Sequence, residues 1–227
     1  CLGHVAAATV FGENNPAGRT PTTWYRSVRD LPALDDYDIA KNHVTYLYFR
    51  GKPLYAFGYG LSYTTFEYSN LTLDKSKMKD TDTLTVSVNV RNTGKVKGKE
   101  VVQLYVGMPE SHTIRPIKEL RGFEKVELEP GEEKTVTFTL AKRAFAYYRT
   151  DISDWYVESG DYTIMAAKSS RDIACTATVN VTSTTQIKRV YTMNSTIEEI
   201  MESPVGREIL GKMMAQNPLA QADADDI

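Results

Sequence analysis

The chain has 227 residues, of which 41% are hydrophobic and 25% are charged, a composition typical of a folded globular protein rather than a disordered one. Its formal net charge of −2 argues against a nucleic-acid partner, and no apolar run approaches the ~20 residues that span a bilayer. With two cysteines and three scattered histidines, the sequence predicts no disulfide framework, no metal site and no cofactor.

The first 66 residues show little periodicity. Small and apolar residues from Val5 to Phe11 predict the last turns of a helix that Gly12 closes. This helix has no N-terminal cap, which favours a chain cut from something longer. Residues 24–66 are irregular and rich in aromatic side chains, as is typical of a functional loop or a covering layer.

The next segment carries the pattern of an antiparallel β-sandwich. Apolar and polar residues alternate within several short runs, at 84–90, 101–106, 135–140, 162–166 and 173–181. Because a period of two places alternate side chains on opposite faces, we expect one face of each strand to be buried and the other to be wet. Turn-forming residues separate the runs. This spacing predicts a mainly β fold, an immunoglobulin-like or fibronectin type III-like sandwich in which Cys175 is a buried free thiol.

From about Ser183 the period changes to that of helices. Two apolar stripes follow, which are Ile197, Ile200 and Met201, then Leu210, Met213 and Met214. An amphipathic helix pair must bury its apolar face somewhere, so we expect the tail to dock on its own chain or on a neighbouring protomer.

Two segments together resemble the C-terminal part of glycoside hydrolase family 3, the β-glucosidase and β-xylosidase family. The first is VFGENNPAGRTP at residues 10–21, and the second is PLYAFGYGLSYTTF at residues 53–66, where Ala56 replaces the usual proline. Further matches follow in the same order, at 92–94, 100–106, 118–123 and 130–132.

The resemblance implies three parts. Residues 1–66 correspond to the C-terminal end of an α/β sandwich domain and a hinge. Residues 67–182 correspond to a fibronectin type III-like domain, and residues 183–227 form a helical tail that resembles extensions in some bacterial members. The partners implied are the remainder of the glycosidase and a β-glycoside or oligosaccharide substrate, with a homo-oligomer through the tail as a further expectation.

The implied reaction is retaining hydrolysis of terminal β-linked sugars, which needs two carboxyl groups ~5–5.5 Å apart. In the family, the nucleophilic aspartate lies on a (β/α)₈ barrel and the acid/base glutamate lies well upstream of the NPAGR segment. The sequence contains neither region, so we assign no catalytic residue. Asp154 stands in the tripeptide that surrounds the family's nucleophile, but it lies between sandwich strands and is interpreted as structural.

Aromatic residues offer the one candidate contact with substrate. Sugar rings stack on aromatic faces, so Tyr46, Tyr48 and Phe49, near Arg50, are predicted to border the outer sugar subsites. The competing interpretation is that these rings only attach the sandwich to the catalytic domains.

Other features have simpler interpretations. The acidic residues Asp35, Asp36 and Asp38 are expected to form a solvated loop, since the glycine spacing of a calcium loop is missing. Gly58 and Gly60 are expected to allow positive φ angles at a sharp turn.

Two alternative functions stay open at this point. A carbohydrate-binding module would present an aromatic platform, for which Tyr105, Tyr147 and Tyr148 are the candidates, although they do not form one stripe. A cell-surface adhesion sandwich is less favoured, because the chain has no disulfide pair and carries the family's hinge.

Overall fold

The computed structural model describes residues 2–187, 195–201 and 203–215. The chain divides into two compact units, Cys1–Thr185 and Gln186–Ile227, and each is described by itself. In the described part of the chain, no helix is long and apolar enough to cross a membrane.

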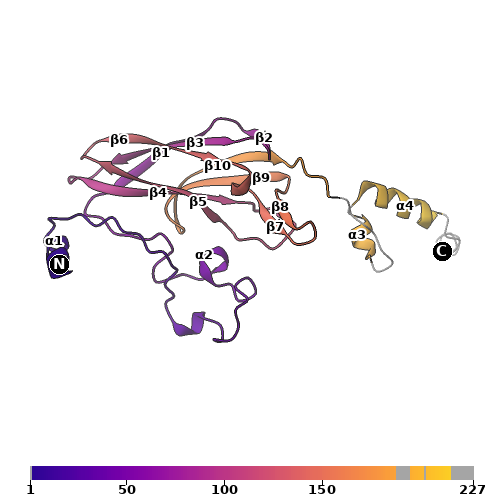
Figure 1. The fold of residues 1–227 in the computed structure, drawn as a ribbon, viewed down its shortest axis with the longest axis horizontal. Coiled ribbons are helices and arrows are strands. Elements are labelled where there is room, and N and C mark those ends of the chain that lie inside the picture. Colours follow the sequence, from indigo (N-terminus) through magenta and orange to yellow (C-terminus); the bar gives the residue numbers. More distant parts are fainter. Residues whose placement is uncertain (1, 188–194, 202, 216–227) are drawn as a thin grey trace, which may run out of the picture. The chain divides into compact units, whose positions relative to one another are not determined.

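The first unit is built around two antiparallel sheets that form a sandwich (Figure 1). One sheet has the order β1-β3-β6, and its strands are Phe66–Leu73, Leu84–Asn92 and Glu133–Leu140. The other has the order β2-β10-β9-β4-β5, and its strands are Lys77–Lys79, Asp172–Thr182, Gly160–Ser169, Gly98–Gly107 and Glu119–Leu128. The short β2 pairs with β10 in parallel, and a separate hairpin joins β7, Tyr147–Arg149, to β8, Asp154–Tyr156.

The core lies between the two sheets, as the alternating pattern predicts. The even positions of β3 from Leu84 to Val90 are fully buried, and they pack with Val102 and Leu104 of β4. The threonines of β6 face outward while Val136 and Leu140 are buried. Burial of such side chains contributes about 1.5–3 kcal/mol each, so this layer is the main source of stability.

Strand β4 departs from the expected alternation. Gln103 is only 3% exposed and Tyr105 is fully buried, although they share the face opposite to Val102 and Leu104. The expectation of one wet face was therefore wrong for this strand, because the segment before the sandwich covers it.

That covering segment has little regular structure. It contains helix α1, Leu2–Val10, the single 3₁₀ turn η1, Val28–Asp30, and the short helix α2, Thr45–Tyr48. Gly12 follows α1 with a φ of 82°, which fits the predicted helix end. In Figure 1 the segment runs in indigo and purple along the side of the sandwich that carries β4 and β5.

Asn92 at the end of β3 joins the segment to the sandwich. Its side chain is fully buried and accepts a hydrogen bond of 2.6 Å from the Thr64 hydroxyl. Its amide nitrogen donates to the carbonyl oxygens of Val96 and Leu128. A buried amide is tolerated only when its hydrogen bonds are made, and here they are made to three different segments.

The second unit contains helices α3, Ile197–Met201, and α4, Pro204–Ala215. Ser203 caps α4, since its hydroxyl accepts from the backbone N–H of Gly206 at 2.9 Å. Gly206 packs directly on the carbonyl of Ile200, where a Cβ would lie 2.0 Å from the oxygen. Helix α4 exposes Val205, Ile209 and Met213, while the side chain of Met214 lies outside the described part.

Candidate functional site

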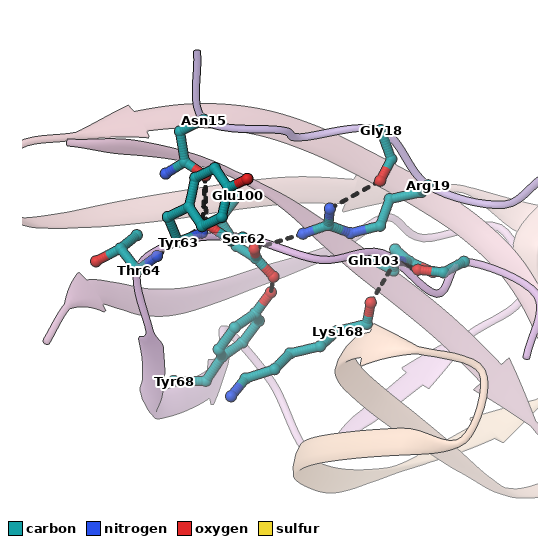
Figure 2. A network of polar contacts seen from close by, with 11 residues as sticks. Asn15, Gly18, Arg19, Ser62, Tyr63, Thr64, Tyr68, Glu100, Gln103 and Lys168 are labelled. Carbon is teal, nitrogen blue, oxygen red and sulfur yellow. Dashed lines mark hydrogen bonds and ion pairs between the residues drawn. The ribbon is translucent and has the colours of Figure 1, made fainter. Parts of the chain in front are cut away.

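A connected network of polar contacts lies where the N-terminal segment meets β4. We call it the junction, and it comprises residues 15–20, the hinge 53–66, strands β1 and β4, and the turn 168–172. Figure 2 shows its polar contacts.

A buried ion pair forms the centre of the junction. The guanidinium Nη2 of Arg19 lies 2.6 Å from Glu100 Oε2, and their side chains are 12% and 3% exposed. The Tyr68 hydroxyl donates to the other carboxylate oxygen at 2.8 Å. Three segments from distant parts of the chain therefore meet at one carboxylate (Figure 2).

Burial and charge act in opposite directions on Glu100. Desolvation raises the pKa of its carboxyl, and the positive charge of Arg19 offsets part of that rise. Burial also raises the pKa of the Tyr68 hydroxyl, and the charge of Glu100 adds to that rise. Tyr68 therefore stays protonated and serves as a donor to the carboxylate.

Gln103 fastens the hinge to the outer face of β4. Its Nε2 donates to the carbonyls of Gly58 at 3.0 Å and Lys168 at 2.7 Å, and its Oε1 accepts from Tyr105 Oη at 2.7 Å. Gly58 has a φ of 78°, and a Cβ there would lie 2.0 Å from Gln103 Oε1. Glycine is needed at this position for both its dihedral and its size.

Gly60 has a different role from the one expected. Its φ is not positive, so the prediction of a left-handed dihedral there was wrong. The reason for glycine is space, because a Cβ would lie 2.3 Å from the carbonyl oxygen of Gly18. The hinge and the NPAGR segment pass each other at this point.

Asn15 makes a second connection between the same segments. Its Oδ1 accepts from the Ser62 hydroxyl and from the backbone N–H of Tyr63, and its Nδ2 donates to the carbonyl of Lys97. The Tyr63 hydroxyl in turn donates to the Thr9 carbonyl at the end of α1. Figure 2 shows Asn15 beside Ser62 and Tyr63.

A groove of about 600 Å³ lies beside these contacts. We call it the junction groove. It is lined by residues of the segment 50–66, by Arg19 and Glu100, and by the turn 168–172.

The four predicted substrate-edge residues lie in and beside α2, but mostly make contacts inside the chain. The Tyr46 ring stacks on Phe57 with centroids 4.1 Å apart, and its hydroxyl accepts from the Leu120 N–H. Phe49 is buried, and its ring packs edge to face on Tyr25. Tyr48 is half-buried and Arg50 is exposed.

The other sequence candidates lie apart from the junction. Asp154 is exposed in β8, and its carboxylate accepts from the backbone N–H of Trp155. Asp36 pairs with Lys41 at 3.1 Å on the surface. Within the described residues, no group of three acidic, histidine or cysteine side chains is arranged to hold a metal ion.

Two expectations about single side chains need correction. Tyr105 is fully buried, so it cannot belong to an exposed sugar-stacking platform with Tyr147 and Tyr148. Cys175 is half-buried rather than buried, because it packs against the outside of the buried cluster that contains Val102 and Ala166. Its partial burial raises the pKa of the thiol.

The sequence did not show that Arg19 pairs with Glu100 or that Gln103 bonds to the hinge. Each lies in a segment that carries the family resemblance, but the pattern does not say which side chains meet. The available signal was the position of a glutamate and a glutamine within an otherwise apolar strand.

The geometry defines a fibronectin type III-like sandwich with an irregular N-terminal segment fastened to its β4 face. Comparison with known families agrees, since residues 2–63 match the glycosyl hydrolase family 3 C-terminal domain and residues 100–170 match the fibronectin type III-like domain. The chain belongs to glycosyl hydrolase family 3 and corresponds to its C-terminal region.

Individual relatives support this assignment. The chain is 46% identical to thermostable beta-glucosidase B of Acetivibrio thermocellus over 99% of this chain and 31% of that protein. It is 41% identical to a putative beta-xylosidase of Formosa agariphila over 73% of this chain and 22% of the relative. The crystal structure of a Bifidobacterium adolescentis family 3 beta-glucosidase matches 92% of this chain and 32% of its own, with 34% identity and a TM-score of 0.79. The chain thus spans about a third or less of the length of these relatives.

Replacement of Gly58 by alanine tests the hinge. The new Cβ displaces Gln103 from three hydrogen bonds, so we expect a loss of about 2–4 kcal/mol in unfolding free energy. Gly131→Ala is the matched control, since Gly131 has a φ of 79° with nothing within 4 Å of an added Cβ, and it should lose about 1 kcal/mol. Urea unfolding measures both variants, and equal losses would contradict the proposed clash.

Replacement of Arg19 by methionine tests the buried ion pair. We expect a loss of about 3 kcal/mol in unfolding free energy at pH 7, because Glu100 stays buried without a partner. Removing Arg19 raises the pKa of Glu100 further in the folded state, so the folded protein binds a proton that the unfolded chain releases, and the loss shrinks as the pH falls toward about 5.

Lys41→Met is the control for this variant, since it breaks a surface pair whose contribution is about 0–1 kcal/mol. Urea unfolding at a series of pH values measures all three proteins. A loss for Arg19→Met that is independent of pH would show that the carboxylate does not need its partner.

Proposed function

We propose that this chain is the supporting part of a glycoside hydrolase that cleaves terminal β-linked sugars, in the manner of a β-glucosidase. The reaction is retaining and uses two carboxylates that lie in the remainder of the protein, outside these residues. The family assignment and the names of the relatives support this function, and the chain spans only about a third of the length of those relatives, which is compatible with a catalytic pair outside it.

The observation that carries the proposal is the uncovered apolar surface of residues 2–66. Helix α1 buries none of its side chains. The strongly exposed apolar and aromatic side chains of this segment are Leu2, Val10, Phe11, Val28, Leu34 and Tyr37. Apolar surface of this extent marks an interface. The contacts of the junction hold the segment that carries this surface on the sandwich. The remainder of the glycosidase is the partner that this surface fits.

Part of the same segment is proposed to border the sugar subsites. Of the four predicted residues, Arg50 offers an exposed side chain, and Tyr48 keeps part of its ring accessible. Tyr46 and Phe49 support the segment from inside through their ring contacts. The assignment of these four residues to a substrate edge stays a prediction.

Activity measurements separate this function from a free-standing binding module. The 227-residue chain alone should release no 4-nitrophenol from 4-nitrophenyl β-glucoside. A protein that also contains the remainder of the glycosidase should release it. A carbohydrate-binding module would instead be retained on an insoluble β-glucan. Sugar release by the chain alone, with its purity confirmed by intact mass, would overturn the supporting role.

We further propose that the tail forms contacts between protomers. Helix α4 exposes an apolar stripe of Val205, Ile209 and Met213, and a stripe of this kind is stable only when it is covered. Deletion of residues 190–227 should lower the number of protomers per particle, which light scattering gives as the measured mass divided by the mass of the chain. Ile209→Glu should have the same effect, and Arg207→Glu, at an exposed polar position, should not. An unchanged number of protomers in both the deletion and Ile209→Glu would exclude the oligomer.

A further inference from the structure

The junction groove has a charge that contrasts with the rest of the chain. Its lining includes five cationic side chains, Arg19, Arg50, Lys52, Lys168 and Arg171. Only two carboxylates, Glu100 and Asp172, accompany them. A local excess of positive charge therefore lies in a chain whose formal net charge is −2. Such an excess inside a concave surface attracts anions.

Two of the five cations are used by the fold itself. Arg19 neutralises Glu100 through the buried ion pair. Arg171 donates from Nη2 to the carbonyl oxygens of Phe49 and Gly51, and thereby holds the segment after α2 against the β9–β10 turn. These contacts shape the wall of the groove.

The other three cations form no ion pair in the described part of the chain, although Lys168 lies close enough to Glu100 for its charge to lower the pKa of that carboxyl. Arg50 and Lys52 are exposed and form neither a hydrogen bond nor an ion pair there. Lys168 is half-buried, and its ammonium lies 5.9 Å from the centre of the Tyr68 ring. Figure 2 shows its side chain extending toward that ring. A half-buried ammonium without an acceptor is a group that a ligand can satisfy.

The surroundings of the groove increase the positive field. Lys118 lies close enough to Arg171 for repulsion to lower the pKa of its amine, together with burial, which has the larger effect. The self-repulsion of such a cluster costs stability, and a bound anion would relieve it.

The size and the polar groups of the groove indicate the class of ligand. Its volume of about 600 Å³ lies within the range of pockets for small organic molecules, and it is much larger than an inorganic anion needs. Tyr59 lines the groove with a half-buried ring that packs on Tyr55 with centroids 5.2 Å apart, so an aromatic side chain in a fixed position is available for contact with a pyranose.

We propose that the junction groove binds an anionic sugar, whose carboxylate or phosphate group is held by Lys168, Arg50 and Lys52. The glycosidase activity proposed above is not a premise of this site, although Arg50 also belongs to the predicted substrate edge. The groove proposal can therefore fail while the proposed glycosidase function holds, and the glycosidase function can fail while the groove proposal holds.

The experiment is a titration of the 227-residue chain with a ligand. Binding is measured by calorimetry and by changes in the amide NMR signals of Gly51 and Ser169. The probes are glucuronate and glucose 6-phosphate, with glucose as the neutral sugar and inorganic phosphate as the anion without a sugar ring. We expect the two charged sugars to bind, glucose to bind at least roughly tenfold more weakly, and an increase in salt concentration to weaken the binding of the charged sugars.

Single substitutions test which side chains of the groove contact the ligand. Lys168→Gln and Arg50→Gln should each weaken the binding of glucuronate by roughly fivefold or more, since each removes a charge-assisted hydrogen bond. Lys125→Gln, at an exposed lysine of β5 that does not line the groove, should leave it unchanged. Circular dichroism spectra confirm that the variants are folded.

Three results would overturn the proposal. The first is equal binding of glucose and glucuronate, which would make the cations irrelevant. The second is binding of inorganic phosphate alone, which would show an ion site without sugar recognition. The third is an equal effect of Lys168→Gln and Lys125→Gln, which would show a response to net charge only.

Discussion

The burial of one carboxylate governs how this chain is assembled. Glu100 lies at the edge of the core with a side chain that is only 3% exposed, and a charge in that position needs a partner. The partner is Arg19, which comes from a segment 81 residues earlier, and Tyr68 supplies a further hydrogen bond from the opposite sheet. A buried ion pair adds little net stability compared with apolar packing, but a missing partner is costly. The pair therefore selects the one arrangement in which the N-terminal segment lies on the sandwich.

The same constraint explains why β4 is buried on both faces. Val102 and Leu104 enter the core, while on the other side Gln103 meets the hinge and Tyr105 packs on Tyr46 of α2. A strand in a free sandwich would keep that second face wet. Here the polar groups on the second face form hydrogen bonds within the protein instead of with water, so the preceding segment packs on this face of the sheet. The sandwich is thus part of an interface and not an independent module.

The sequence predicts what depends on neighbours along the chain and misses what depends on distant partners. Alternation and turn residues placed β3, β4, β6, β9 and β10, because the side-chain period and the left-handed φ of Gly131 are local properties. Aromatic composition identified the covering segment, but it could not show that Tyr46 would stack on Phe57 while Arg50 stayed exposed. The role of Gly60 was misjudged for the same reason, since only the folded chain brings the Gly18 carbonyl against it.

The segments that resemble family 3 meet one another in the junction. Arg19 belongs to the NPAGR segment, Gly58 to the hinge and Glu100 with Gln103 to β4, and together they form one network of contacts. Their chemistry is that of attachment, since every one of these groups is satisfied by another part of the chain. Family resemblance in this region therefore reflects how the N-terminal segment is joined to the sandwich, and it is compatible with different sugars in different members. What the protein does must be argued from the groups that the junction leaves unsatisfied, which are the exposed apolar face of residues 2–66 and the free cations of the junction groove.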